Sequence, residues 1–212
     1  MTIIGFLHTA EVHVGTFRGL LRELGPGCAD VHVVDESLLA DARVRGVDSD
    51  VEHRLLERLR EVAAQGPDVI VCTCSTLGGH AERMGAAVGV PVLRVDRPMA
   101  EAAVAAGARI GVVASTASTL GPTCELLASC ARPGTEIVEA PCLDAWPLFE
   151  AGDLDGYARR VAEHARTLDV DVVVLAQASM AGAEGLLADL GRPVLCSPRI
   201  AVRRTLEDYT VV

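Results

Sequence analysis

Aromatic residues are scarce in this sequence, where Phe, Trp and Tyr make up only 3% of the 212 residues. Half of the residues are nevertheless hydrophobic, so the core has to be built from Val, Leu, Ala and Ile. Such side chains are typical of buried parallel strands that are covered by helices on both faces. The length fits one large domain or two lobes of roughly 100 residues each.

Basic residues are also few, with 19 Lys and Arg against 29 Asp and Glu. The resulting net charge of −10 argues against nucleic acid or an anionic membrane surface as a partner. An acidic ligand would need local capture by helix N-termini or backbone N–H groups. Long apolar runs and a signal-peptide pattern are missing too, so we expect no membrane association and a cytoplasmic location.

Disulfide, metal and nucleotide signatures are missing as well. Seven cysteines are an odd number without the spacing of a disulfide framework or a zinc site, which favours a reduced setting and no metal. No GxGxxG follows the first expected strand, and no Walker sequence is present. The cysteines are Cys28, Cys72, Cys74, Cys124, Cys130, Cys142 and Cys196.

Short apolar runs alternate with segments of helical periodicity along the whole chain. Strands are expected at residues 2–7, 31–34, 69–71, 90–93, 109–114, 136–139, 172–174 and 193–195. Helices are expected at residues 17–24, 48–64, 79–88, 97–106, from about 120, 153–168, 183–190 and from 198, with 35–47 as a loop or short helix. This pattern predicts an α/β fold of two similar βα lobes with parallel sheets and a cleft between them. We expect residues 1–97 and 198–212 in one lobe and 98–197 in the other.

One stretch, residues 68–80, organises the chain around it. A short apolar strand runs into Cys72-Thr-Cys-Ser-Thr76, and a glycine pair follows. This arrangement places thiols and hydroxyls at the carboxyl edge of a sheet, where open α/β sheets bind ligands.

The stretch has a counterpart in residues 171–182. Aligning the leading aspartates pairs Cys74 with Gln177, Ser75 with Ala178, Thr76 with Ser179 and Gly79 with Gly182. The pairing indicates a duplicated unit, and the alternative is chance similarity between two valine-rich strands.

These motifs resemble those of the aspartate/glutamate racemase superfamily, which includes hydantoin racemases, maleate isomerases and arylmalonate decarboxylases. Its members carry Asp-x-Ile-x-x-x-Cys-Asn-Thr in the first half, which corresponds here to Asp68 followed by Cys74-Ser75-Thr76. The usual second motif, Leu-Gly-Cys-Thr, corresponds to residues 175–178, where Gln177 replaces the cysteine. Residues 113–119 look like the family's loop of Thr and Ser that binds a carboxylate.

The resemblance implies an enzyme without a cofactor that acts on a small carboxylate or amino-acid-like substrate, and a possible homodimer. Cys74 would be the catalytic group, with a pKa lowered by its surroundings. Gln177 can neither give nor accept a proton, so the chain would be an atypical member. The substrate would be held by His8, Thr9, Ser75, Thr76, Ser115, Thr116, Thr119, Gln177 and Ser179.

Three interpretations remain open. In the first, Cys74 acts alone, as an acid in an isomerase or decarboxylase, or by adding to a double bond. In the second, His8, His13, His80 or Cys196 supplies the missing base. In the third, the protein binds a small carboxylate without converting it. Cys72 is the alternative reactive thiol, and the hydroxyls at residues 115–119 could serve only as helix caps.

Overall fold

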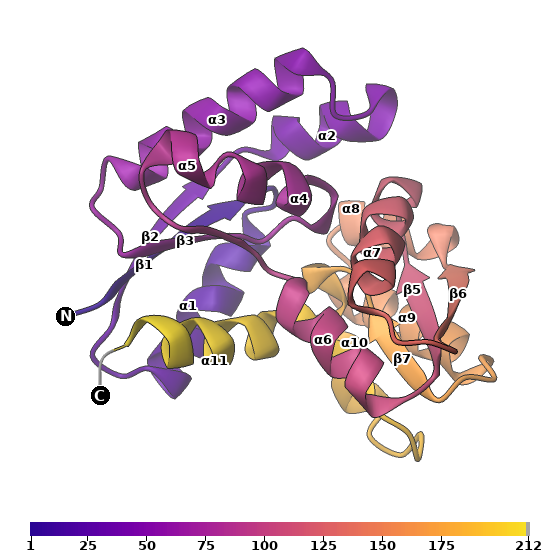
Figure 1. Ribbon diagram of the computed structural model, residues 1–212. Coiled ribbons are helices and arrows are strands. Elements are labelled where there is room, and N and C mark those ends of the chain that lie inside the picture. Colours follow the sequence, from indigo (N-terminus) through magenta and orange to yellow (C-terminus); the bar gives the residue numbers. More distant parts are fainter. Residues whose placement is uncertain (211–212) are drawn as a thin grey trace. The chain divides into compact units, whose positions relative to one another are not determined.

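A computed structural model describes residues 1–210, which divide into two compact units. The first unit comprises Met1–Val95 and the residues from Pro198 onward. Its sheet has four parallel strands in the order β2-β1-β3-β4. Helices cover both faces, with α2, α3 and α5 on one and α1 and α11 on the other (Figure 1). Its elements are β1 Ile3–His8, α1 Val12–Leu24, β2 Ala29–Val34, α2 Glu36–Arg45, α3 Ser49–Ala63, β3 Val69–Cys72, α4 Ser75–Arg83, α5 Gly85–Val88, β4 Val92–Arg94 and α11 Ser197–Tyr209.

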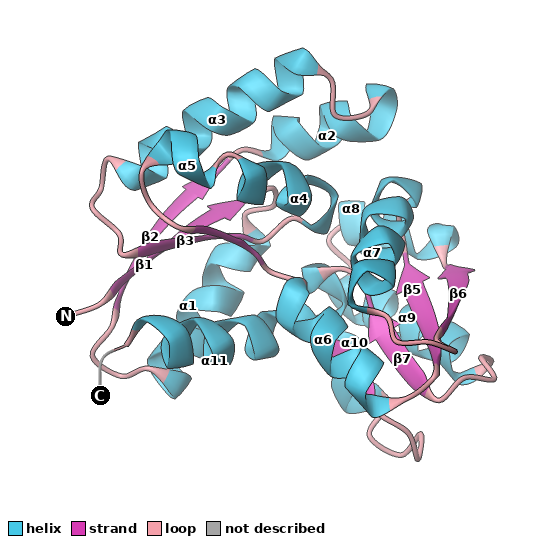
Figure 2. Ribbon diagram, in the orientation of Figure 1, coloured by secondary structure: helices cyan, strands magenta, loops and turns pink. Residues whose placement is uncertain are grey.

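The second unit, Asp96–Ser197, repeats this topology with the strand order β6-β5-β7-β8, again all parallel. Figure 2 shows its strands in magenta among cyan helices. Its elements are α6 Arg97–Ala106, β5 Arg109–Ala114, α7 Ala117–Cys130, β6 Glu136–Pro141, η1 Leu143–Ala145, α8 Trp146–Glu150, α9 Leu154–Arg166, β7 Val172–Leu175, η2 Ala178–Ala181, α10 Gly182–Leu186 and β8 Val194–Cys196. The predicted α/β class with two similar lobes of parallel strands is therefore confirmed.

Several helices begin earlier than the sequence pattern predicts. The helix expected from residue 79 starts at Ser75, because the glycine pair lies inside it. A Cβ on Gly78 would lie 2.9 Å from the Cβ of Arg94, so packing requires glycine where the sequence indicates a break. The first helix starts at Val12, where no side chain caps it and no start signal exists. Residues 36–45 form a full helix, with the Asp35 carboxylate accepting from the Ser37 N–H.

Hydrogen bonds at equivalent positions support the internal duplication. The N–H of Asp68 donates to Ile3, and the N–H of Asp171 donates to Arg109, at the start of the central strand of each lobe. Just beyond the next strand, the N–H of Thr73 donates to Leu7, and that of Ala176 to Val113. The alignment of Cys74 with Gln177 follows from this common register, since each lies one residue further along.

Close packing beneath each central strand depends on a glycine at an equivalent position, Gly5 in β1 and Gly111 in β5. A Cβ on Gly5 would lie 2.5 Å from Val62 Cγ1, and one on Gly111 would lie 3.1 Å from Leu168 and Val170. Each strand thus presents bare backbone to the segment that leads into β3 or β7.

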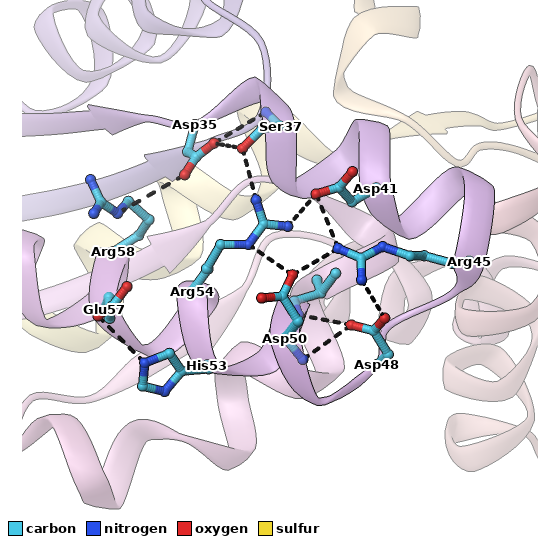
Figure 3. Close-up of polar contacts among 11 residues, drawn as sticks. Asp35, Ser37, Asp41, Arg45, Asp48, Asp50, His53, Arg54, Glu57 and Arg58 are labelled. Atoms are coloured by element: carbon cyan, nitrogen blue, oxygen red, sulfur yellow. Dashed lines mark hydrogen bonds and ion pairs between the residues drawn. The ribbon is translucent and has the colours of Figure 1, made fainter.

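An ion-pair network on the surface ties α2 to α3 (Figure 3). Arg45 contacts Asp41, Asp48 and Asp50, and Arg54 contacts Asp41 and Asp50. Most of these groups are well exposed, so each pair contributes at most about 1 kcal/mol. The helix that Asp48 caps thus has a charged face towards solvent.

Replacing Gly5 with Ala should lower the free energy of unfolding by about 1–3 kcal/mol, because the added methyl group overpacks against Val62. Gly19→Ala is the matched control, since its methyl group meets nothing within 4 Å on the exposed side of α1. The control should gain about 0.5–1 kcal/mol, because Ala is the better helix former. Urea unfolding followed by circular dichroism measures both, and an undiminished stability of Gly5→Ala would contradict this packing.

Candidate active site

The Cys74 thiol lies at the carboxyl end of the first sheet. One residue, Thr73, separates it from the end of β3, and it occupies the N-cap position of α4 in an extended conformation. Its sulfur forms hydrogen bonds with the hydroxyls of Thr9 and Thr76 and with the backbone N–H groups of Thr76 and Leu77. Thr9 directly follows β1, which pairs with β3, and Thr76 and Leu77 lie in the first turn of α4. These groups form a cradle of donors around one sulfur atom.

Burial raises the pKa of the Cys74 thiol above its ordinary value, despite the opposing hydrogen bonds from Thr9, Leu77 and Thr76. The expectation of a lowered pKa is therefore wrong in direction, because the cost of desolvating a thiolate exceeds what the donors return. Cys74 is a protonated thiol at neutral pH in this structure. Such a group is better suited to give a proton than to attack as a thiolate.

Cys72 lies deeper than Cys74. Its side chain is fully buried, whereas Cys74 keeps 7% of its surface exposed. The Cys72 thiol donates a long contact of 3.9 Å to the backbone oxygen of Cys74. Of the two residues, Cys74 is thus the less buried one.

His8 takes part in a chain of buried polar side chains within the first lobe. Its Nδ1 lies 2.9 Å from Thr73 Oγ1, and its Nε2 lies 2.8 Å from His32 Nδ1. His32 Nε2 lies 2.6 Å from Asp30 Oδ2, which also accepts from Arg18 Nε at 2.8 Å. Both ring nitrogens of His8 are therefore bonded to protein groups, and neither is left for a substrate proton.

Burial lowers the pKa of His8 to about 3, and the positive field of His32 and His13 adds to the shift. Burial alone lowers the pKa of His13 to about 4. His32 also has a lowered pKa through burial, although hydrogen bonding to Asp30 opposes the shift. All three rings are therefore neutral at physiological pH. The chain of His8, His32 and Asp30 was not found from the sequence, because His32 and Asp30 lie on a strand whose polar residues resemble a solvated edge.

The second lobe carries a polar cluster at the equivalent strand end. Gln177 occupies the N-cap of η2, and its Oε1 accepts from Ser115 N at 2.6 Å and Ser115 Oγ at 2.8 Å. The hydroxyl of Tyr157 lies 3.0 Å from Ser115 Oγ and 2.9 Å from Ser179 Oγ. Nothing in the sequence distinguishes the hydroxyl of Tyr157 from that of a core tyrosine. The lobes thus match: Thr9 contacts Cys74, and Ser115 contacts Gln177.

The remaining predicted residues have varied surroundings. Thr116 occupies the N-cap of α7, where its Oγ1 lies 2.8 Å from Thr119 Oγ1 in the first turn and accepts no backbone N–H of that turn. Ser75 is buried in the first turn of α4. Cys196 is fully buried and donates to the Gln177 backbone oxygen at 3.5 Å, which indicates a structural role. His80 bonds to Glu52 at 2.7 Å, between α4 and α3.

In residues 1–210, no group of three or more His, Cys, Asp and Glu side chains is placed to hold a metal ion. Over the same residues, no helix combines the length and hydropathy needed to cross a membrane.

The buried histidines make stability depend on pH. Each has a folded pKa below its unfolded value of about 6.5, so the unfolded chain binds more protons as the pH falls below that value. We expect the free energy of unfolding to be highest above pH 6.5 and to fall towards the folded values of about 3 for His8 and 4 for His13. The slope is up to about 1.4 kcal/mol per pH unit for each histidine. His13→Phe should reduce that slope, measured by urea unfolding at several pH values, and the exposed His53→Gln should serve as the matched control. Equal slopes in all three proteins would contradict this account.

The donors around Cys74 should set the rate of its alkylation. Thr9→Val removes one hydrogen bond to the thiolate, so the pKa should rise further and reaction with iodoacetamide at mildly alkaline pH should slow several-fold. Thr16→Val is the control, because the Thr16 hydroxyl bonds only the Val12 backbone oxygen in α1. Peptide mass spectrometry separates Cys74 from the six other cysteines. Faster alkylation in Thr9→Val would show that Thr9 does not stabilise the thiolate.

Comparison with known proteins agrees with this arrangement. The family model described as Asp/Glu/Hydantoin racemase matches residues 8–205. A glutamate racemase from Cupriavidus pinatubonensis is 37% identical over 109 residues, covering 50% of this chain and 40% of that protein. Another, from Picosynechococcus sp., is 30% identical over 166 residues, covering 76% and 57%. The aligned regions thus span roughly half of the length of these curated relatives.

Solved structures show the same fold. Aspartate racemase from Picrophilus torridus superposes with a TM-score of 0.75 at 14% identity, covering 98% of this chain and 94% of that chain. Glutamate racemase from Bacillus anthracis gives a TM-score of 0.76 at 18% identity, covering 98% and 82%. Since the family model covers nearly all of the chain and the fold agrees, the protein belongs to the Asp/Glu/Hydantoin racemase family.

Proposed function

We propose that this protein is a cofactor-independent isomerase or lyase in which Cys74 transfers a proton to or from carbon next to a carboxylate. The observation that carries the proposal is the Cys74 cradle, where a thiol lies at a strand end with four hydrogen bonds to its sulfur. The family match supports racemase-like chemistry, and the names of the relatives point to amino-acid-like substrates.

The chemistry follows from what each group can do. A carbanion with enolate character can form next to a carboxylate in two ways. Carbon dioxide leaves and the C–C electron pair stays on carbon, or Cys74, after giving its own proton to solvent, takes the proton from carbon and the C–H electron pair stays there. The Cys74 thiol gives its proton to that carbon, the electron pair of the S–H bond stays on sulfur, and the donors of Thr9, Thr76 and Leu77 hold the thiolate that remains. Solvent then returns the proton to sulfur. The raised pKa of Cys74 favours this acid role over thiol addition to a double bond.

The hydroxyls near the two strand ends are proposed to hold the oxygens of the substrate. Ser75 and Thr76 lie in the first turn of α4, and Ser115, Thr116 and Thr119 lie at the start of α7. Helix N-termini favour negative charge, so both turns suit a carboxylate or an enolate.

The rival function is a small-carboxylate-binding protein that turns nothing over. It is favoured by Gln177, which occupies the second lobe's equivalent of Cys74 and has no proton to transfer near neutral pH. A two-thiol racemase is therefore not available to this chain. A binding protein and a catalyst with one thiol would both bind the carboxylate, and only the catalyst would convert it.

Proton NMR in D₂O distinguishes these functions. Incubation with a panel of amino acids, hydroxy acids, malonates and maleate should exchange an α-proton or convert one compound, and Cys74→Ala should abolish that reaction. Cys28→Ala, which alters a half-buried cysteine of the same lobe, is the matched control and should retain it. A reaction that survives in Cys74→Ala would refute the assigned role of the thiol, and no reaction in folded protein across the panel would favour the binding function.

A further inference from the structure

The hydrogen bonds around Gln177 run in a single direction. A backbone N–H can only donate, so the Gln177 atom 2.6 Å from Ser115 N is the carbonyl oxygen Oε1. Ser115 Oγ lies 2.8 Å from the same oxygen and donates to it as well. With its one proton used, Ser115 Oγ accepts from Tyr157, and the Tyr157 oxygen in turn accepts from Ser179. Every proton of this chain therefore points towards Gln177 Oε1.

This direction settles how the carboxamide of Gln177 is oriented. Its oxygen is held by two donors, so the amide nitrogen Nε2 must point the other way with two N–H groups. Within residues 1–210 these N–H groups have no hydrogen-bond partner, although only 8% of the residue is exposed. The polar side-chain atoms buried without a partner in that range do not include Nε2, so the nitrogen reaches the surface.

The cost of turning the carboxamide over is large. A reversed amide would place the N–H groups of Nε2 against the donors of Ser115, leaving buried donors unpaired at about 1–3 kcal/mol each. Chains of hydrogen bonds that share one direction also strengthen one another. The strand end of the second lobe therefore presents fixed donors rather than a group that can adapt to either polarity.

We propose that Gln177 is a specificity-determining residue that takes an oxygen acceptor of the substrate, a carboxylate or carbonyl oxygen, and rejects an ammonium group. This inference rests on the proposed function and narrows its substrate class to acids that carry a second acceptor oxygen, such as dicarboxylates. An ammonium has only donors, which would meet the donors of Nε2. The N-terminus of α7, which begins two residues beyond Ser115, adds positive potential beside the same position.

A change of polarity at residue 177 offers a direct test. In Gln177→Glu, one carboxylate oxygen would keep the bonds from Ser115, and the other would present an acceptor where Nε2 presented donors. Gln177→Leu would remove both. The exposed Gln65→Glu is the matched control for added negative charge, because it lies in the first lobe and is the only other glutamine of the chain.

Isothermal titration calorimetry with succinate and β-alanine, which differ by a carboxylate replaced with an ammonium group, measures the preference. We expect the unaltered protein and Gln65→Glu to bind succinate at least about tenfold more tightly than β-alanine. Gln177→Glu should lose about tenfold or more in succinate affinity without losing β-alanine, and Gln177→Leu should lose succinate affinity with no gain for β-alanine. Succinate affinity unchanged in both variants, a preference for β-alanine, or no succinate binding by the folded protein would each overturn the proposal.

Repeating the titrations in Cys74→Ala separates this inference from the proposed function. A succinate preference that depends on Gln177 in this variant stands even if the protein has no turnover. Conversely, turnover that requires Cys74 but is indifferent to residue 177 leaves the proposed function intact and refutes the role of Gln177.

Discussion

The register of the parallel pair at the centre of each sheet is the constraint on which the site depends. Leu7 pairs with Cys72 in the first lobe, and Val113 pairs with Leu175 in the second. Two residues beyond each pair, the chains bring Thr9 to Cys74 and Ser115 to Gln177. A slip of one residue would turn the side chains to the opposite face and replace Cys74 with its neighbour. Gly5 and Gly111 in the central strands let the segments leading into β3 and β7 pack directly on the backbone.

The two lobes share a topology but differ in the group at the equivalent strand end, which is a thiol at Cys74 and a carboxamide at Gln177. At the first strand end, burial raises the pKa of the Cys74 thiol, while its hydrogen bonds with Thr9, Thr76 and Leu77 favour the thiolate. At the second, a carboxamide without a transferable proton is locked by a chain of hydroxyls that all point at its oxygen. In the proposed function, the two equivalent strand ends therefore have different roles, proton transfer for Cys74 and oxygen recognition for Gln177.

Strand positions, and with them the place of Cys74 at a strand end, could be predicted because they depend on local signals, whereas the role of Cys74 stays a prediction. Runs such as Val69–Cys72 and Val172–Leu175 are apolar throughout, as strands covered on both faces must be, and the aspartates before them fix the alignment of the halves.

The start of α4 could not be predicted, since its glycine pair is explained only by Arg94 in β4. Tyr157 and His32 were missed for a related reason. Their partners lie 42 and 24 residues away in sequence, at Ser115 and His8. The direction of the Cys74 pKa shift also needed the structure, because burial and hydrogen bonding oppose each other there.

The configuration of the product formed in D₂O tests the central claim most directly. If Cys74 is the single proton donor, deuterium reaches carbon from one face, and the labelled product should be one enantiomer, as resolved by chromatography on a chiral phase. A racemic labelled product from pure enzyme, formed at the rate of turnover, would mean that a second group delivers protons. That result would contradict an account in which Gln177 leaves the second lobe without one.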